Sequence, residues 1–178
     1  MKAITSGWMK GCIFLMIFAF GVTGPVVFDA AKASAAQGQD ISCRYCGMMK
    51  AKFGYSWMVI DYNDGTQSEV CSIHCAALDM ALNTGKTPKA IAVGDYNTQE
   101  PIDAEKAYWV IGGNKPGVMT ARAKWAFAGK EAADKFINEH GGELATFDDA
   151  VKASFEDMYQ DTLMIRKKKA AMQKKMGS

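Results

Sequence analysis

The sequence predicts an α+β fold in which two similar strand-strand-helix-strand units are followed by a C-terminal helix. This prediction depends on the order of β-prone and helical segments, which occurs twice along the chain, and on the Gly-containing turns between them. A composition that is 49% hydrophobic and 22% charged excludes a disordered chain and supports a packed core. The length of 178 residues is typical of one domain, or of two small ones sharing a core.

The first unit is expected within residues 36–93 and contains most of the cysteines. Its expected elements are strands at 56–62 and 66–71, a helix at 72–83 and a short strand at 90–93. Asp64-Gly65 separates the first two strands and predicts a tight hairpin, because both residues tolerate the positive φ that such a turn requires. Ser72 stands where a helix N-cap is expected.

The second unit is expected at residues 94–147 and repeats this order of elements. Its expected elements are strands at 107–111 and 124–128, a helix at 130–140 and a strand at 143–147. Gly141-Gly142 marks the end of the helix. Residues 94–104 are interpreted as a connection between the two units.

The last segment, 148–178, is predicted to be a helix with a basic end. Asp148 can act as its N-cap. Four apolar residues at helical spacing are expected to face the core: Val151, Phe155, Met158 and Tyr159. The basic residues near the end are interpreted as a solvated helix terminus, because positive charge complements the negative end of the helix dipole.

Residues 1–35 are predicted to be a signal peptide. Lys2 and Lys10 precede or border an apolar run of eleven residues, which is short for a membrane-spanning helix. Ala33-Ser34-Ala35 provides a cleavage site of small residues. The chain is therefore expected to be periplasmic or otherwise extracytoplasmic. The alternative is an uncleaved anchor that tethers the chain to the membrane through residues 12–28.

The charge of the mature chain argues against a nucleic-acid partner. Cleavage after Ala35 would remove three basic side chains and one acidic one, which brings the formal net charge from +2 to zero. No general basic field then attracts the chain to nucleic acid.

Four cysteines carry the strongest chemical signal in the sequence. Cys43 and Cys46 form a C-x2-C pair, and Cys71 and Cys75 follow after 24 residues with His74 between them. A C-x2-C turn lets two sulfurs converge on one ion, as in zinc and iron-sulfur sites. The cysteines therefore predict a metal site.

The second cysteine group has its own predicted geometry. If a helix begins at Ser72, then Cys71, His74 and Cys75 lie on one face of its first turn and can point at one object. A helix N-terminus lowers the pKa of nearby thiols, so these sulfurs are expected to be partly thiolate.

Methionines near the cysteines favour a soft metal. Met48 follows the first pair, and Met119 lies in a Gly-containing loop. Thiolate and thioether sulfur select copper(I) over hard cations. Met58 and Met80 are interpreted instead as core residues.

Five segments share a recognisable pattern: Cys43-Arg-Tyr-Cys46-Gly-Met48, Asp64-Gly65, Tyr108-Trp-Val-Ile111-Gly-Gly, Pro116-Gly-Val-Met119 and Phe136 through His140-Gly-Gly142. Together they resemble the NosL family, whose members are exported accessory proteins of nitrous oxide reductase. The resemblance implies a copper(I) carrier, not an enzyme, that delivers metal to a cuproenzyme client. Copper ligation by Cys and Met in the family maps onto Cys46, Met48 and Met119, with Cys43 as an additional thiolate. The Cys71/Cys75 spacing is similar to the TRASH metal-sensing domain.

Two other interpretations of the cysteines stay open. The four thiols, or three of them with His74, make an acceptable tetrahedral set for structural zinc. Alternatively, exported chains meet an oxidising compartment, so the cysteines could form disulfides or serve in thiol-redox chemistry.

Overall fold

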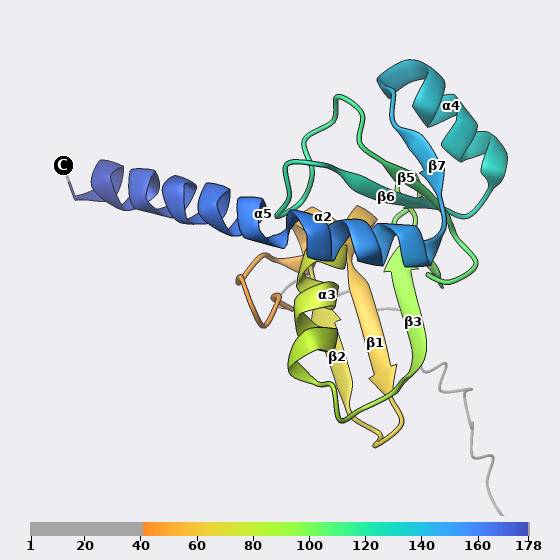
Figure 1. Ribbon diagram of the computed structural model, residues 1–178, viewed down its shortest axis with the longest axis horizontal. Coiled ribbons are helices and arrows are strands. Elements are labelled where there is room, and N and C mark those ends of the chain that lie inside the picture. The colour runs from red at the N-terminus through yellow and green to blue at the C-terminus, as the bar shows by residue number, and fades with distance from the viewer. Residues whose placement is uncertain (1–40, 178) are drawn as a thin grey trace, which may run out of the picture. The chain divides into compact units, whose positions relative to one another are not determined.

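The computed structural model describes residues 41–177 (Figure 1). The predicted signal peptide or anchor at 1–35 lies outside these residues and stays a prediction. In chain order the elements are α2 (Lys50–Phe53), the 3₁₀ helix η1 (Gly54–Ser56), β1 (Met58–Tyr62), β2 (Gln67–Val70), α3 (Ile73–Leu82), β3 (Pro88–Gly94), β4 (Pro101–Asp103), β5 (Tyr108–Ile111), β6 (Lys124–Phe127), α4 (Lys130–His140), β7 (Glu143–Ala145) and α5 (Phe147–Met176).

Two antiparallel sheets share one arrangement. In the first sheet, ordered β2-β1-β3-β4, the central strand β1 pairs with both β2 and β3. In the second, ordered β6-β5-β7, β5 takes the same central place between β6 and β7. Each unit therefore has its first strand in the middle, and the predicted fold class is confirmed. The predicted limits of the two units remain predictions.

Three short elements were not predicted. The segment 94–104 contains β4, which pairs with the end of β3 at Gly94↔Pro101 and two further positions. The helices α2 and η1 follow the first cysteine pair directly. All three are only three or four residues long, too short to show a helical or strand periodicity in the sequence.

One core joins the two units. Alternate residues of β1 are buried on the side that carries Met58 and Ile60, and they belong to the same cluster as Trp109 and Phe127 of the second sheet. Met58 is fully buried, which confirms its prediction as a core residue. Met80 packs against this core as a partly buried residue. The core therefore supports the cysteine segments with side chains from both halves of the chain.

The long helix α5 connects the halves by packing against α3 and β5 (Figure 1). Its N-cap is Thr146 rather than the predicted Asp148, because Thr146 and Asp149 form a reciprocal capping box. Phe155 and Tyr159 are 46% and 69% exposed, so their prediction as core residues was wrong. The helix instead buries Ala150, Ala153 and other small residues along its contact face.

Ion pairs fix α5 to the second sheet. Asp157 accepts hydrogen bonds from Arg122 Nε at 2.9 Å and from Lys124 Nζ at 2.8 Å. The Lys124 side chain is 1% exposed, so Asp157 provides the counter-charge that a buried ammonium needs. Within residues 41–177, no helix has the length and apolar character needed to cross a bilayer.

Candidate metal centre

The first cysteine pair lies on a tight loop between Cys43 and Met48. The Cys43 N–H donates to the carbonyl of Met48, and the Gly47 N–H donates to the carbonyl of Cys43, both at 2.8 Å. Gly47 has a φ of 76°, which glycine adopts without the steric cost of a Cβ. This turn directs the Cys43 and Cys46 side chains toward the same point.

The second pair comes from the junction between β2 and α3. Cys71 follows the last residue of β2, and Cys75 lies in the first turn of α3. Ser56 Oγ donates to the carbonyl of Cys71 at 2.8 Å and holds its backbone in the core. Ser72 occupies the predicted N-cap position, but its side chain makes no cap hydrogen bond.

The four sulfurs converge. All four Sγ atoms lie within 4.8 Å of one another, with Cys46 and Cys71 3.3 Å apart and Cys71 and Cys75 3.7 Å apart. Sulfurs at 2.3 Å from one tetrahedral ion would be about 3.8 Å apart. All four are free thiols, so no disulfide joins them in this structure. We call this group the thiol cluster.

The chemistry of the thiol cluster favours a cation. Two thiolates 4 Å apart repel each other by about 4 kcal/mol at an effective dielectric of 20. Four such charges in a largely buried space are therefore unfavourable, unless a positive ion lies among them or protons remain on the sulfurs. The cluster is thus able to hold one metal ion by exchange with protons.

The pKa values of the first cysteine pair are lowered, and those of the second pair are raised. The pKa of Cys43 is lowered, first by its hydrogen bond with Cys46 and then by those with Cys71 and Cys75. Cys43 raises the pKa of Cys46, but hydrogen bonds with Cys71 and Cys75 outweigh it and bring the value to about 7. The pKa values of Cys71 and Cys75 are raised, first by Cys43 and then by Cys46. The prediction that the second pair is partly thiolate was therefore wrong, because neighbouring sulfurs outweigh the helix terminus.

A buried carboxylate supports the first pair. Asp79 of α3 is fully buried and accepts hydrogen bonds from Tyr45 at 2.5 Å, from Ser68 at 2.7 Å and from Tyr62. Burial opposes its ionisation, but these hydroxyl donors hold the pKa of Asp79 below its usual range. Tyr45 lies between Cys43 and Cys46, so Asp79 ties their loop to the helix that carries Cys75.

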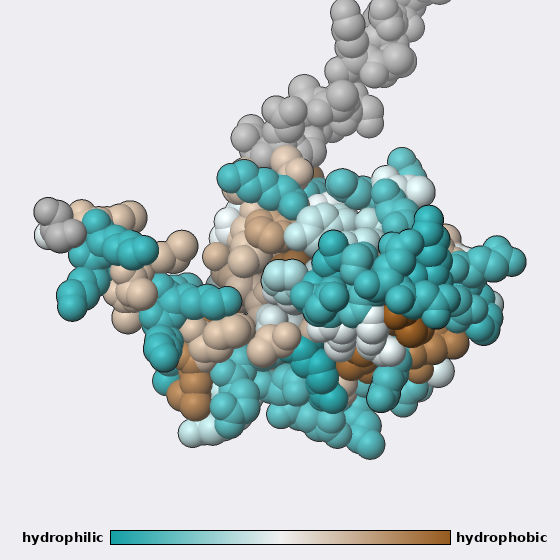
Figure 2. Space-filling model, turned by 90° about the horizontal axis from the view of Figure 1, so that it is seen from above, coloured by the Kyte–Doolittle hydropathy of each residue, from teal (hydrophilic) through white to brown (hydrophobic). Residues whose placement is uncertain are grey.

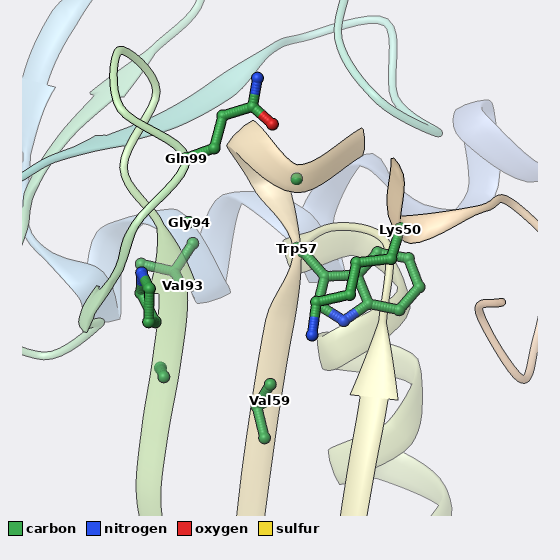
Figure 3. Close-up of a pocket in the computed structure, with 9 residues that line it drawn as sticks. Lys50, Trp57, Val59, Val93, Gly94 and Gln99 are labelled. Carbon is green, nitrogen blue, oxygen red and sulfur yellow. The ribbon is translucent and has the colours of Figure 1, made fainter. Parts of the chain in front are cut away.

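A second connection lies on the other face of the first sheet, beside a cavity of about 100 Å³ (Figure 3). Glu69 accepts from Lys50 Nζ at 3.1 Å and from Trp57 Nε1 at 2.8 Å. The Lys50 Nζ also lies 5.8 Å from the Trp57 ring centroid. Lys50 begins the helix after the first pair, and Glu69 lies two residues before Cys71, so this contact fixes the spacing of the two pairs.

His74 faces a different partner. It is not among the side chains whose ligand atoms converge in the thiol cluster. Its Nδ1 lies 3.3 Å from Asp161 Oδ2 of α5, although the angles are not those of a hydrogen bond. Burial lowers the pKa of His74, and Asp161 opposes that effect. His74 nevertheless lines a cavity together with Cys46 and Cys75, so its role as an optional metal ligand stays a prediction.

The two predicted methionines lie beside the thiol cluster. Met48, Met119 and Cys46 line one cavity of about 270 Å³, which we call the sulfur cavity. Met119 has a φ of 62°, a left-handed conformation that is uncommon for a residue with a Cβ. Asp161 Oδ1 accepts the Ala121 N–H at 2.9 Å and holds this loop against α5.

Sequence reasoning missed four residues around the site. Asp79 and Asp161 are fully buried carboxylates, whereas Met164 and Met172 of α5 also line the sulfur cavity. The single charge in the apolar stretch of α3 was a signal for Asp79. Met164 and Met172 lie eight residues apart on one face of the helix. The segment between them is dominated by lysines, so its composition gave no sign that the two methionines share a face.

The NosL family model matches residues 34–155, which include all four cysteines of the cluster and Met119. The chain belongs to the NosL family. Among curated proteins, the HTH-type transcriptional repressor CutR of Bacillus subtilis is 30% identical over 136 residues; the match covers 76% of this chain and 66% of CutR.

Among solved structures, the copper chaperone NosL from Shewanella denitrificans matches with a TM-score of 0.51 and 24% identity. The match covers 62% of this chain and 89% of that protein. This likeness is one of fold. The helix α5 continues beyond residue 155, where the family match ends.

We predict that Asp79→Asn lowers the free energy of unfolding by about 2 kcal/mol, because three hydroxyl groups lose a charged acceptor. The lowered pKa of Asp79 means that its contribution is complete above the unfolded value of about 3.9 and is lost as pH falls through the folded pKa. Urea unfolding from pH 7 to pH 3 should therefore be less pH-dependent in the variant. Asp134→Asn on exposed α4 is the control, and equal effects in the two variants would contradict the prediction.

We also predict that Cys46 is the first cluster thiol to react with an alkylating reagent. It is only partly buried, whereas the other three are at most 2% exposed. In metal-free reduced protein the rate should rise through an apparent pKa of about 7. Peptide mapping by mass spectrometry identifies the modified thiol, and Cys46→Ser should remove the fast phase. First modification at Cys71 or Cys75 would contradict this prediction, because it would show that a buried thiol is more accessible to the reagent than Cys46.

Proposed function

We propose that this protein is a copper(I) chaperone, a carrier with no catalytic chemistry of its own. The observation that carries the proposal is the thiol cluster beside a cavity lined with thioether sulfur. Thiolate and thioether are the soft donors that suit copper(I). The copper is the cargo, held until a partner takes it.

The burial of the four thiols supports transfer rather than storage alone. Cys43, Cys71 and Cys75 are buried, whereas Cys46 is partly exposed and borders two cavities. An incoming sulfur or imidazole can reach copper from the Cys46 side, where the two cavities lie. Metal then leaves by ligand exchange, in which a partner's bond to copper forms as the Cys46 bond breaks.

The comparisons support the choice of metal. The S. denitrificans protein with the same fold is described as a copper chaperone. Membership of the NosL family agrees with a carrier role. Because the chain spans only 66% of CutR, repression is not carried over to it.

Structural zinc is the second candidate, because the sulfur separations of the cluster also suit a tetrahedral zinc site made of four thiolates. A closed zinc site would make the fold depend on the metal. It would leave the neighbouring thioethers without a role, since zinc sites rarely use them.

We predict that the full chain binds a first equivalent of copper(I) in anaerobic competition with a chelator. Cys43→Ser combined with Cys46→Ser should weaken this equivalent by at least roughly a hundredfold, about 2.8 kcal/mol. Cys71→Ala with Cys75→Ala should weaken it as well. Met80→Leu removes a sulfur outside the site and serves as the control.

Full affinity in the first double variant would rule out Cys43 and Cys46 as ligands. Loss of folding with intact affinity in the second would make Cys71 and Cys75 structural. One tightly held zinc that copper(I) does not displace, together with unfolding on chelation, would favour the zinc candidate.

We further propose that the chain is exported and delivers copper to an extracytoplasmic cuproenzyme, with nitrous oxide reductase as the expected client. The predicted signal at 1–35 and the NosL family support this proposal. Protein from the periplasmic fraction should begin at Ala36, as measured by intact mass. The copper-loaded chain should transfer metal to copper-free nitrous oxide reductase, whereas free copper(I) buffered by chelator at equal activity should load it more slowly. An uncleaved N-terminus would indicate the anchor, and equal rates would argue against this client.

A further inference from the structure

The helix α5 carries apolar side chains on the side that faces away from the core. Phe155, Tyr159 and Leu163 are 46%, 69% and 43% exposed and are spaced by four residues, so they form one line along the helix. Leu163 follows the buried Ser154 by nine residues, or two and a half helical turns, and therefore points to the opposite side. We call this line the outer ridge. A helix that only covers a core has polar residues on this side.

The second half of α5 carries charge of one sign. Residues 162–176 contain six basic side chains and no acidic one. In the first half of the helix, Glu156 and Asp157 are paired with Arg122, and Asp157 also pairs with Lys124. The four consecutive cations at 166–169, by contrast, form no ion pair with a carboxylate within residues 41–177. Their positive charge is therefore uncompensated in the described part of the chain.

This end of α5 is not covered by any other part of residues 41–177. Every residue from Arg166 to Gly177 is exposed, and Figure 1 shows this part of the helix extending past the two sheets. Figure 2 shows it as teal hydrophilic side chains with tan, more apolar ones between them. A helical segment of this length is marginal in water when it has nothing to pack against. A surface outside the chain would therefore stabilise it.

We propose that the outer ridge and the basic end of α5 dock on a lipid bilayer that contains anionic headgroups. The helix lies in the plane of the interface, with its large apolar side chains at the boundary between headgroups and acyl chains and its cations on the lipid phosphates. Tyr159 suits this depth, because its ring is apolar and its hydroxyl reaches the wet headgroup layer. No helix within residues 41–177 can cross a bilayer, so α5 rests on the surface.

The distribution of the cations favours a lipid surface over an acidic protein. Arg166 and Lys167 follow Leu163 by three and four residues, so they continue the outer ridge. The four cations at 166–169 are about 100° apart around the helix and point in all directions. A fixed acidic patch on a protein meets one side of a helix. Mobile headgroups rearrange around it, and long basic side chains reach them from its flanks.

Docking in this orientation leaves the thiol cluster on the protein side of the helix. The helix α5 packs against α3, which carries Cys75. The bilayer would lie across α5 from α3, because the outer ridge is opposite the buried face. This proposal does not depend on which metal the cluster holds.

The test measures binding of the full chain to vesicles by co-sedimentation. Vesicles of phosphatidylcholine alone are compared with vesicles that also contain phosphatidylglycerol. The anionic lipid should strengthen binding at least about tenfold, and high salt should reverse this gain. Amide hydrogen exchange, measured by mass spectrometry, should slow in residues 155–176 when the anionic vesicles are present. This second measurement distinguishes α5 from any attachment through residues 1–35.

Two sets of variants test the cations and the outer ridge separately. Replacement of the four cations should remove the gain from the anionic lipid: Arg166→Gln, Lys167→Gln, Lys168→Gln and Lys169→Gln. Its control replaces four exposed cations on other elements: Lys52→Gln, Lys89→Gln, Lys130→Gln and Lys135→Gln. Tyr159→Ser with Leu163→Ser should weaken binding to the anionic vesicles at least about threefold. Leu82→Ser with Leu144→Ser changes exposed leucines of α3 and β7 and should have no such effect.

Four outcomes would overturn the proposal. The first two are no gain from the anionic lipid, or the same gain in the variant without the four cations. A dimer that forms without lipid and is lost with Tyr159→Ser and Leu163→Ser would assign the outer ridge to a second copy of the chain. Slower exchange in residues 155–176 with polyglutamate but not with anionic vesicles would assign the basic end to an acidic protein. The copper titration of the thiol cluster is a separate measurement, so the two proposals can fail independently.

Discussion

The arrangement depends on one constraint, the crowding of four sulfurs from two separate segments into a largely buried space. Sulfurs that ionise there repel one another, so the protein must hold them together by other means until a cation arrives. Asp79 binds the tyrosine between the first two cysteines, and Glu69 binds the lysine that follows them. Both carboxylates belong to the elements around the second pair. The first pair is thus held to the second by polar contacts that do not use the sulfurs.

Under this constraint, the four cysteines differ in how far each is exposed to solvent. The sulfurs of Cys43, Cys71 and Cys75 are buried, whereas Cys46 is partly exposed, so a ligand from solvent reaches the cluster most directly at Cys46. Raised pKa values of Cys71 and Cys75 keep protons on these thiols in the absence of metal. A metal ion that binds all four sulfurs would therefore displace protons from Cys71 and Cys75, whereas the lowered pKa of Cys43 favours its thiolate.

Much of the fold could be predicted because local patterns determine it. The Asp64-Gly65 turn, the glycines after α4 and the repeated order of elements are properties of short segments. The cysteine group was also visible as spacing. By contrast, the direction of His74, the burial of Asp79 and the cap at Thr146 depend on which element packs nearby. Phe155 and Tyr159 follow helical spacing, yet α5 is rotated about its axis so that the small residues Ala150, Ala153 and Ser154 face the core instead.

The attachment of α5 to the second sheet has a further consequence for interpreting sequence variants of this chain. Lys124 and Arg122 contain no sulfur and belong to the half of the protein without cysteines, yet they hold the helix that lies against the cluster. Under the proposed copper function, a genetic screen for defective copper handling would therefore recover lesions in β6 and its preceding loop. Such alleles would look like simple folding defects, although they act by loosening the helix that lies beside the thiol cluster.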